Sequence, residues 1–208
     1  MIKSFGLSVK GEDHLENEDA FLLDDSRRIY AVADGVSIPS GGKQASLFCI
    51  KNIGKTHSKK IEERIVELNK KLIEFRKTKW IGYSTLTVLN IKEKFAEVVN
   101  VGDSPAFLVR NGEIKLLTTI DRSFEGHLLQ AMGNENIDVH IKNIKLKQND
   151  LIILMTDGIS DLLSEKEILK ISTEHKTPEN IAKNIINEVL KKETYYNDDK
   201  TIVVVKHE

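Results

Sequence analysis

Short apolar runs separated by polar turns recur along most of the chain. Val, Ile, Phe, Tyr and Thr cluster in runs bounded by Gly, Asn, Asp or Lys, which is typical of β-strands. Asn111-Gly112 lies between two such runs and is the strongest signal for a tight hairpin, and residues 92–93 are a second candidate turn. The predicted strands are residues 2–9, 19–24, 28–33, 84–91, 94–101, 105–110, 113–118, 138–146, 150–156 and 200–206.

Four other segments have apolar residues at helical spacing. Ser164 followed by Glu167 predicts a capping box, and Thr177 followed by Pro178 predicts another helix start. The predicted helices are residues 42–56, 59–78, 164–172 and 178–192.

The order of these elements favours one α+β fold. The strands come in groups, with a helix pair after the third strand and another helix just before the last. This order favours antiparallel sheets packed against helices over alternating βαβ units. Residues 1–208 contain no internal repeat or Pro/Gly/Ser linker, so we expect a single domain.

Composition excludes several classes of function. The formal net charge of −1 gives no overall field that would attract nucleic acid or an anionic membrane. Cys49 is the one cysteine, so a disulfide or a cysteine-based metal site is excluded, and a buried inert thiol is expected. No apolar run is long enough to span a bilayer and no signal peptide is recognisable, so we expect a cytoplasmic protein.

Acidic residues stand at the ends of several predicted strands. Asp34-Gly35 follows the apolar run IYAVA, and Asp157-Gly158 follows LIILMT. An aspartate at the end of a strand is most often a turn former, which would explain either residue alone. The repetition of the same pattern weakens that explanation.

Two further acidic pairs extend this pattern. Glu18 and Asp19 precede one strand, and Asp198 and Asp199 precede the last. If these strand ends converge, the crowded carboxylates require cations or protons. Oxygen-only ligand sets suit Mg²⁺ or Mn²⁺, and two such ions can bind phosphate and produce a hydroxide nucleophile. Convergence would therefore favour metal-assisted phosphate ester hydrolysis.

An ordered series of motifs covers nearly the whole chain. Together they resemble the motifs of the PP2C-type (PPM) metal-dependent protein serine/threonine phosphatases, whose fold is an αββα sandwich of two antiparallel sheets flanked by helix pairs. The motifs are NEDAF (17–21), VADGVS (32–37), YSTLTVL (83–89), VNVGDSPAFLVRNGEI (99–114), LTTIDRS (117–123), AMGN (131–134), LIILMTDGISDLLSEKEI (151–168) and NDDKTIVVV (197–205).

The resemblance implies a role for each matching residue. Asp34 would bridge two Mn²⁺ or Mg²⁺ ions, with Asp157 and Asp198 holding the second ion, and these three would be the catalytic residues. Asp121 would be associated with a third, weaker ion. The implied metal ligands are Glu18, Asp19, Asp34, Gly35, Asp157, Asp198 and Asp121.

Other matching residues have supporting roles. Asp103 and Ser104 of the GDS motif, and likewise Thr156, are expected to be chiefly structural, with Asp103 and Ser104 ordering a turn. Thr201 is expected to hydrogen-bond and orient a carboxylate ligand.

Two departures from the family pattern concern phosphate binding and proton transfer. His14 stands where the family usually has an arginine that grips the substrate phosphate. A protonated His14 would still contact phosphate, but without the planar fork of arginine, and a merely solvated histidine is the alternative. Val36 stands where eukaryotic members have a histidine. Bacterial members also lack this histidine, so its absence indicates a bacterial-type enzyme.

The segment between Asp121 and the AMG motif is short, whereas typical members carry a long flap there. A short flap leaves an open cleft, as in minimal phosphatases that act on one dedicated bacterial regulator. Pro105 and Asp199 also replace the common Arg and Asn of the family motifs.

The leading hypothesis is a phosphoserine/phosphothreonine phosphatase that acts on a phosphoprotein in the pathway of a cognate kinase. His14 and the short flap leave two alternatives open. One is a catalytically weak sensor or binding module, and the other is a hydrolase of small phosphate esters.

His14→Ala tests the role of this histidine. If His14 contacts phosphate, the variant should raise the KM for a phosphopeptide because one charged donor is lost. Steady-state kinetics measure this, and an unchanged KM would exclude the contact.

Overall fold

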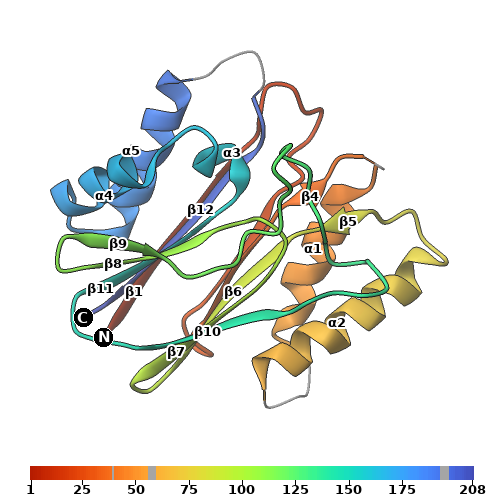
Figure 1. The fold of residues 1–208 in the computed structure, drawn as a ribbon, viewed down its shortest axis with the longest axis horizontal. Helices are drawn as coiled ribbons and strands as arrows, with labels where there is room; N and C mark the ends of the chain where they lie inside the picture. The colour runs from red at the N-terminus through yellow and green to blue at the C-terminus, as the bar shows by residue number, and fades with distance from the viewer. Residues whose placement is uncertain (39, 56–59, 193–196) are drawn as a thin grey trace.

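Two five-stranded antiparallel sheets form the centre of the protein in a computed structural model, which describes residues 1–208 except 39, 56–59 and 193–196 (Figure 1). The first sheet contains, in spatial order, β1 (Ile2–Val9), β12 (Lys200–His207), β11 (Asp150–Met155), β8 (Ala106–Arg110) and β9 (Glu113–Leu116). The second contains β10 (His140–Lys145), β7 (Phe95–Val101), β6 (Leu86–Lys92), β3 (Ile29–Ala33) and β2 (Ala20–Asp24). A separate ribbon pairs β4 (Gly35–Val36) with β5 (Tyr83–Ser84).

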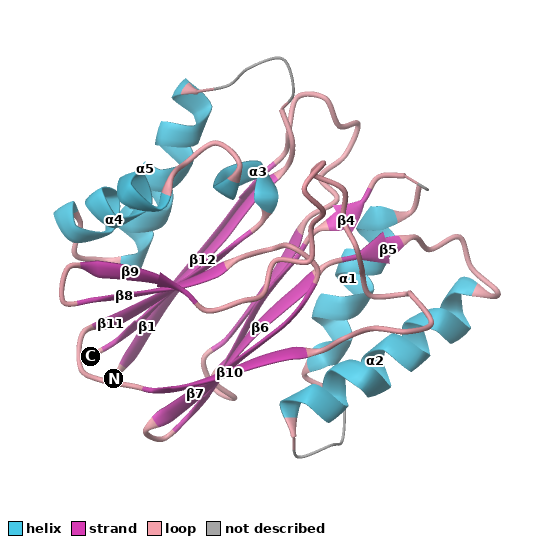
Figure 2. Cartoon of the chain, viewed as in Figure 1, coloured by secondary structure: helices cyan, strands magenta, loops and turns pink. Residues whose placement is uncertain are grey.

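Helices cover the outer face of each sheet (Figure 2). One pair packs on the first sheet and the other pair on the second, so the layers are helix, sheet, sheet, helix. This is the αββα sandwich that the sequence predicted. The helices are α1 (Gly42–Ile53) and α2 (Ile61–Arg76) on the second sheet, α4 (Glu165–Glu174) and α5 (Pro178–Lys191) on the first, and the short α3 (Asp157–Ser160).

Apolar residues of the central strands serve two layers at once. In β12, Ile202 and Val204 face the helices, whereas Val203 and Val205 face the other sheet. Side chains alternate between the two faces of a strand, so a strand buried on both faces needs a continuous apolar run. The unbroken runs in the sequence therefore mark the strands in the middle of the sandwich.

The end of each helix and hairpin follows the local sequence. Ser164 and Glu167 form the predicted capping box of α4, and the Thr177 side chain accepts a hydrogen bond from a backbone N–H of α5. Asn111 and Gly112 have φ values of 53° and 79°, which the tight turn between β8 and β9 requires. These local predictions are confirmed.

The ten predicted strands and four predicted helices all occur, with ends displaced by a few residues. Residues 56 and 59, at the predicted ends of the first two helices, lie outside the described residues. The sequence did not predict α3 or the ribbon of β4 and β5, because elements this short have no periodicity. Asp157 is the first residue of α3 instead of part of a simple turn.

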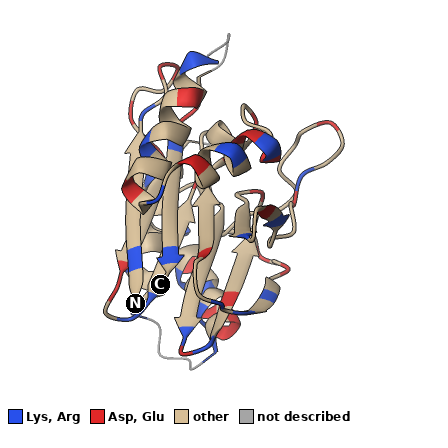
Figure 3. Cartoon of the chain, turned by 90° about the vertical axis from the view of Figure 1, so that its left-hand side faces the viewer, with Lys and Arg blue, Asp and Glu red and all other residues tan. Residues whose placement is uncertain are grey.

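Charged residues lie mainly on the helices and at the ends of the strands, with both signs intermixed (Figure 3). None of the helices in the described part of the chain has the length and apolar character required to cross a membrane.

Arg110 and Asp150 form a buried ion pair between β8 and β11. Nε and Nη2 of Arg110 each donate to one carboxylate oxygen of Asp150 over 2.6 Å, and the Asp150 side chain is fully buried. The backbone N–H of Lys147 also donates to Asp150, so this carboxylate depends on its partners for stabilisation.

Arg110→Ala should lower the free energy of unfolding by about 3 kcal/mol, because a buried carboxylate is left without its cation. Urea denaturation measures the change. Lys183→Ala, which removes an exposed pair with Glu179, is the control and should cost less than about 0.5 kcal/mol. Equal losses in the two variants would contradict a special role for the buried pair.

Candidate metal and phosphate site

Four acidic strand ends meet at one end of the sandwich. β2 pairs with β3 so that Ala20 lies opposite Ala33, which places Asp19 and Asp34 at the same end of the strands of the second sheet. β11 pairs with β12 so that Met155 lies opposite Ile202, which places Asp157 and Asp198 at one end of the strands of the first sheet. The Thr156 hydroxyl donates a hydrogen bond to Asp19 over 2.8 Å and connects these two groups of strand ends. The convergence on which the hypothesis depended is therefore present.

Asp19 is held by hydroxyl groups from the opposite sheet. Thr156 and Thr201 both hydrogen-bond its carboxylate, and Thr156 also accepts the backbone N–H of Thr201 over 3.0 Å. Burial raises the pKa of Asp19 well above its ordinary value, against the lowering effect of these two hydroxyls. Thr201 orients a carboxylate as the sequence predicted, and Thr156 does so too, which the sequence did not indicate.

Asp34 and Asp157 lie next to each other in a buried setting. Burial, followed by the charges of Asp157 and Asp19, raises the pKa of Asp34 well above its ordinary value. The pKa of Asp157 is also raised, again mainly by burial. Its Oδ1 atom is buried and has no hydrogen-bond partner among the described residues. An unpartnered buried carboxylate oxygen beside other acids fits a hard divalent cation.

The acids open into a cavity of about 190 Å³. Gly35 lies at its wall where the chain is too crowded for a side chain, because a Cβ there would lie 2.6 Å from the Glu18 carbonyl oxygen. Glu18 does not line the cavity, but its carboxylate accepts a hydrogen bond from Ser37, which does. The lining residues are Asp34, Gly35, Val36, Ser37, Thr85, Asp103, Arg122, Gly126, Leu128, Asp157 and Asp198.

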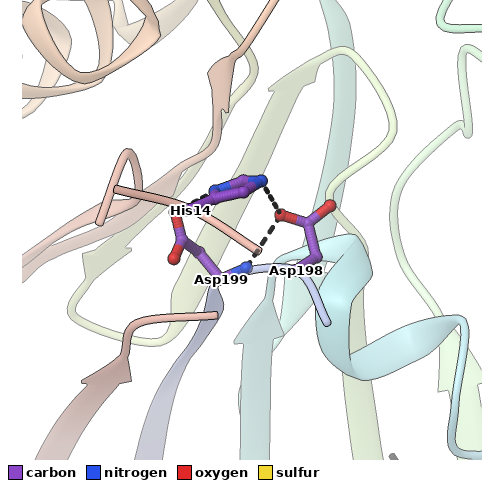
Figure 4. A group of neighbouring side chains, drawn as sticks. All are labelled: His14, Asp198 and Asp199. Carbon is purple, nitrogen blue, oxygen red and sulfur yellow. Dashed lines mark hydrogen bonds and ion pairs between the residues drawn. The ribbon is translucent and has the colours of Figure 1, made fainter. Parts of the chain in front are cut away.

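His14 lies between the carboxylates of Asp198 and Asp199 and does not line this cavity (Figure 4). Its Nδ1 is 2.9 Å from Asp199 Oδ2, and its Nε2 is 3.5 Å from Asp198 Oδ1. Burial alone lowers the pKa of His14, but the hydrogen bond and charge of Asp199 raise it, and the net shift is upward. A direct contact with phosphate stays a prediction.

Asp199 ties the loop between β1 and β2 to the start of β12. Its Oδ1 accepts the backbone N–H of Gly11, and its Oδ2 accepts the N–H of Glu18, each over 2.7 Å. With His14, this carboxylate has three partners and is almost completely buried. Asp199 thereby sets the position of the loop that carries Glu18 and Asp19.

Asp121 lies outside the cavity. Its carboxylate accepts hydrogen bonds from the Gly102 backbone and the Gln130 side chain, and His140 Nε2 lies 2.8 Å from it. These contacts join the loop after β9 to the turn after β7. A third ion at Asp121 would have to displace them.

The sequence did not predict that two charged residues, Asp103 and Arg122, line the cavity. Asp103, which we expected to be chiefly structural, lines it, and burial together with the charge of Asp157 raises its pKa against the effect of Arg122. Arg122 lies directly after Asp121 in the short flap segment and contacts the Asp157 carboxylate. The available signal was an arginine directly after the aspartate of the motif LTTIDRS.

Comparison with known proteins identifies the family of this chain. The family described as Stage II sporulation protein E (SpoIIE) matches residues 49–208. The chain belongs to the SpoIIE family. Stage II sporulation protein E of Bacillus subtilis is 26% identical over 96% of this chain, and Probable protein phosphatase 2C 80 of Arabidopsis thaliana is 28% identical over 73%. The chain spans only 25% and 39% of the length of these relatives.

Solved phosphatase structures share the fold of this SpoIIE-family chain. The serine/threonine phosphatase PstP/Ppp of Mycobacterium tuberculosis superposes with a TM-score of 0.88 at 20% identity, and covers 100% of this chain and 99% of that chain. PppA of Pseudomonas aeruginosa has the same TM-score at 18% identity, over 98% and 96% of the two chains. A PstP catalytic domain in complex with two manganese ions has a TM-score of 0.85 at 21% identity, over 99% and 97%. The predicted resemblance and fold are confirmed.

Asp199→Asn should lower the free energy of unfolding of this SpoIIE-family chain by about 2 kcal/mol, because the amide nitrogen cannot accept one of the buried hydrogen bonds. Urea denaturation measures the loss, and hydrogen exchange should become faster at Gly11 and Glu18. Glu12→Gln, an exposed change in the same loop, is the control. An unchanged exchange rate at both amides would contradict the clamp.

Proposed function

We propose that this chain is a metal-dependent phosphatase that hydrolyses phosphoserine and phosphothreonine in a phosphoprotein. The observation that carries the proposal is the meeting of Asp19, Asp34, Asp157 and Asp198 beside one cavity. Such a group of buried carboxylates costs free energy unless cations offset its charge. These acids stand in the motifs by which the sequence resembles the PP2C-type phosphatases, and the chain shares the fold of solved serine/threonine phosphatases.

Two Mn²⁺ or Mg²⁺ ions fit this set of oxygen ligands. Asp34 would lie between them, the Gly35 carbonyl and Asp19 would complete one side, and Asp157 and Asp198 would hold the other. Glu18 would contribute through water. When bound, such ions polarise phosphate oxygens and lower the pKa of the attacking water, which yields the hydroxide nucleophile. A third ion at Asp121 stays a prediction. The Asp121 carboxylate accepts hydrogen bonds from the Gly102 backbone and the Gln130 side chain, which such an ion would have to replace.

Neighbouring side chains hold these proposed ligands in position. Thr156 and Thr201 hold the Asp19 carboxylate, and Asp199 holds the backbone of Glu18. Preorganised ligands avoid reorganisation when substrate binds. Gly126 and Leu128 of the short flap segment form part of the wall of the cavity.

The biological setting is proposed from the relatives. Solved structures with this fold include the serine/threonine phosphatase PstP and PppA, which is described as a key regulatory component of T6SS in Pseudomonas aeruginosa. We therefore propose a bacterial regulatory phosphatase in the cytoplasm, paired with a cognate serine/threonine kinase.

Asp157→Asn should reduce Mn²⁺-dependent hydrolysis of an aryl phosphate by more than about a hundredfold, because loss of a ligand exceeds the effect of altering a supporting hydrogen bond. Initial rates with Mn²⁺, and after chelation with EDTA, measure this. Asp138→Asn, an exposed carboxylate away from the cavity, is the control and should retain full activity.

The wild-type result separates the alternatives. The absence of turnover with any divalent metal would favour a sensor or binding module over an enzyme. Comparable kcat/KM for an aryl phosphate and for phosphopeptides would favour a hydrolase of small esters, whereas the proposal requires a clear preference for phosphopeptides.

A further inference from the structure

Arg122 contacts three carboxylates from different elements. Its Nε donates to Asp103 over 2.7 Å, its Nη1 donates to both oxygens of Asp161 over 2.8 Å, and its Nη2 donates to Asp157 over 2.5 Å. The side chain is 22% exposed. The guanidinium is therefore fixed in orientation at the edge of the candidate metal site.

Arg122 supplies positive charge where the cavity otherwise lacks it. Among the described residues that line the cavity, it is the only lysine or arginine, and the charged remainder are Asp34, Asp103, Asp157 and Asp198. A phosphate monoester is an anion that these acids repel. The Nη2 group of Arg122 is a fixed cationic donor at this cavity, whereas His14 lies outside its lining, between Asp198 and Asp199.

The hydrogen bonds of the guanidinium divide into two groups. Those from Nε and Nη1 reach Asp103 and Asp161 and hold the plane of the group. The one from Nη2 reaches Asp157, which is also a proposed metal ligand, and Nη2 retains a second hydrogen. A divalent ion at Asp157 would take over the neutralisation of that carboxylate and release Nη2 for an anion in the cavity.

We infer that Arg122 binds the phosphate group of the substrate, and that its charge opposes divalent metal binding at Asp157 when phosphate is absent. The inference rests on the proposed function for the identity of the site. It assigns phosphate recognition to the flap segment instead of to the position of His14. Two opposite effects follow from one residue, since a cation near the ligands weakens metal binding and strengthens phosphate binding.

Two substitutions separate charge from geometry. Arg122→Ala removes both, so Mn²⁺ should bind roughly threefold to tenfold more tightly, and inorganic phosphate should bind to the Mn²⁺-loaded protein at least about tenfold more weakly. Arg122→Lys retains the charge but loses the planar group that Asp103 and Asp161 hold in place, so Mn²⁺ affinity should stay near the wild-type value while phosphate affinity falls. Titration calorimetry measures both affinities directly, without turnover.

Controls keep the inference separate from the proposed function. Arg28→Ala changes an exposed arginine in the turn between β2 and β3, at the opposite end of these strands, and should alter neither affinity. Near-ultraviolet circular dichroism of each variant checks the fold, and Arg122→Lys serves as the test if Arg122→Ala does not fold. If His14 binds the phosphate instead, His14→Ala should weaken phosphate binding while both Arg122 variants keep the wild-type phosphate affinity.

The outcomes distinguish the two ideas. If wild type turns over phosphopeptides but both Arg122 variants bind phosphate as wild type does, the inference is wrong and the proposed function stands. If wild type binds Mn²⁺ and phosphate without turnover, and Arg122→Ala shows the two opposite shifts, the inference stands and the proposed function fails. A loss of phosphate affinity in His14→Ala alone would also overturn the inference.

Discussion

Repulsion among buried carboxylates is the constraint on which the arrangement of this site depends. Asp19, Asp34 and Asp157 all have pKa values raised mainly by burial, and each also feels the charge of an acidic neighbour. Side chains of this kind are stable in their ionised form only beside cations or strong donors. The rest of the site supplies such groups, as hydroxyls at Asp19 and as the Arg122 guanidinium at Asp157.

Both sheets contribute acidic residues to this site. Each sheet contributes one pair of acidic strand ends through its own antiparallel register, and the packing between sheets brings the pairs together. Asp199 fastens the loop between β1 and β2 to the start of β12. Asp199 is buried and holds the backbone of Glu18, so it sets the position of a loop that carries two of the proposed metal ligands.

Much of the fold followed from local sequence. Ser164 and Glu167 form the capping box that their spacing predicts, and Asn111-Gly112 forms its hairpin turn, because both depend on neighbouring residues alone. α3 escaped prediction since four residues carry no periodicity. The surroundings of Asp121 and Asp103 escaped prediction, because both residues lie in loops whose direction depends on distant contacts: Asp121 accepts hydrogen bonds from Gly102 and Gln130, and Asp103 pairs with Arg122.

The sequence by itself determined the longer strands and helices, the family resemblance and the acidic residues that stand at strand ends. Tertiary structure alone decided that those ends meet, that His14 lies against Asp199, and that Arg122 enters the cavity. Hydrophobic periodicity and helix capping depend on residues that are close in the sequence. The approach of Asp34 to Asp157 depends instead on two sheets, each built from distant segments, that bury apolar faces against each other.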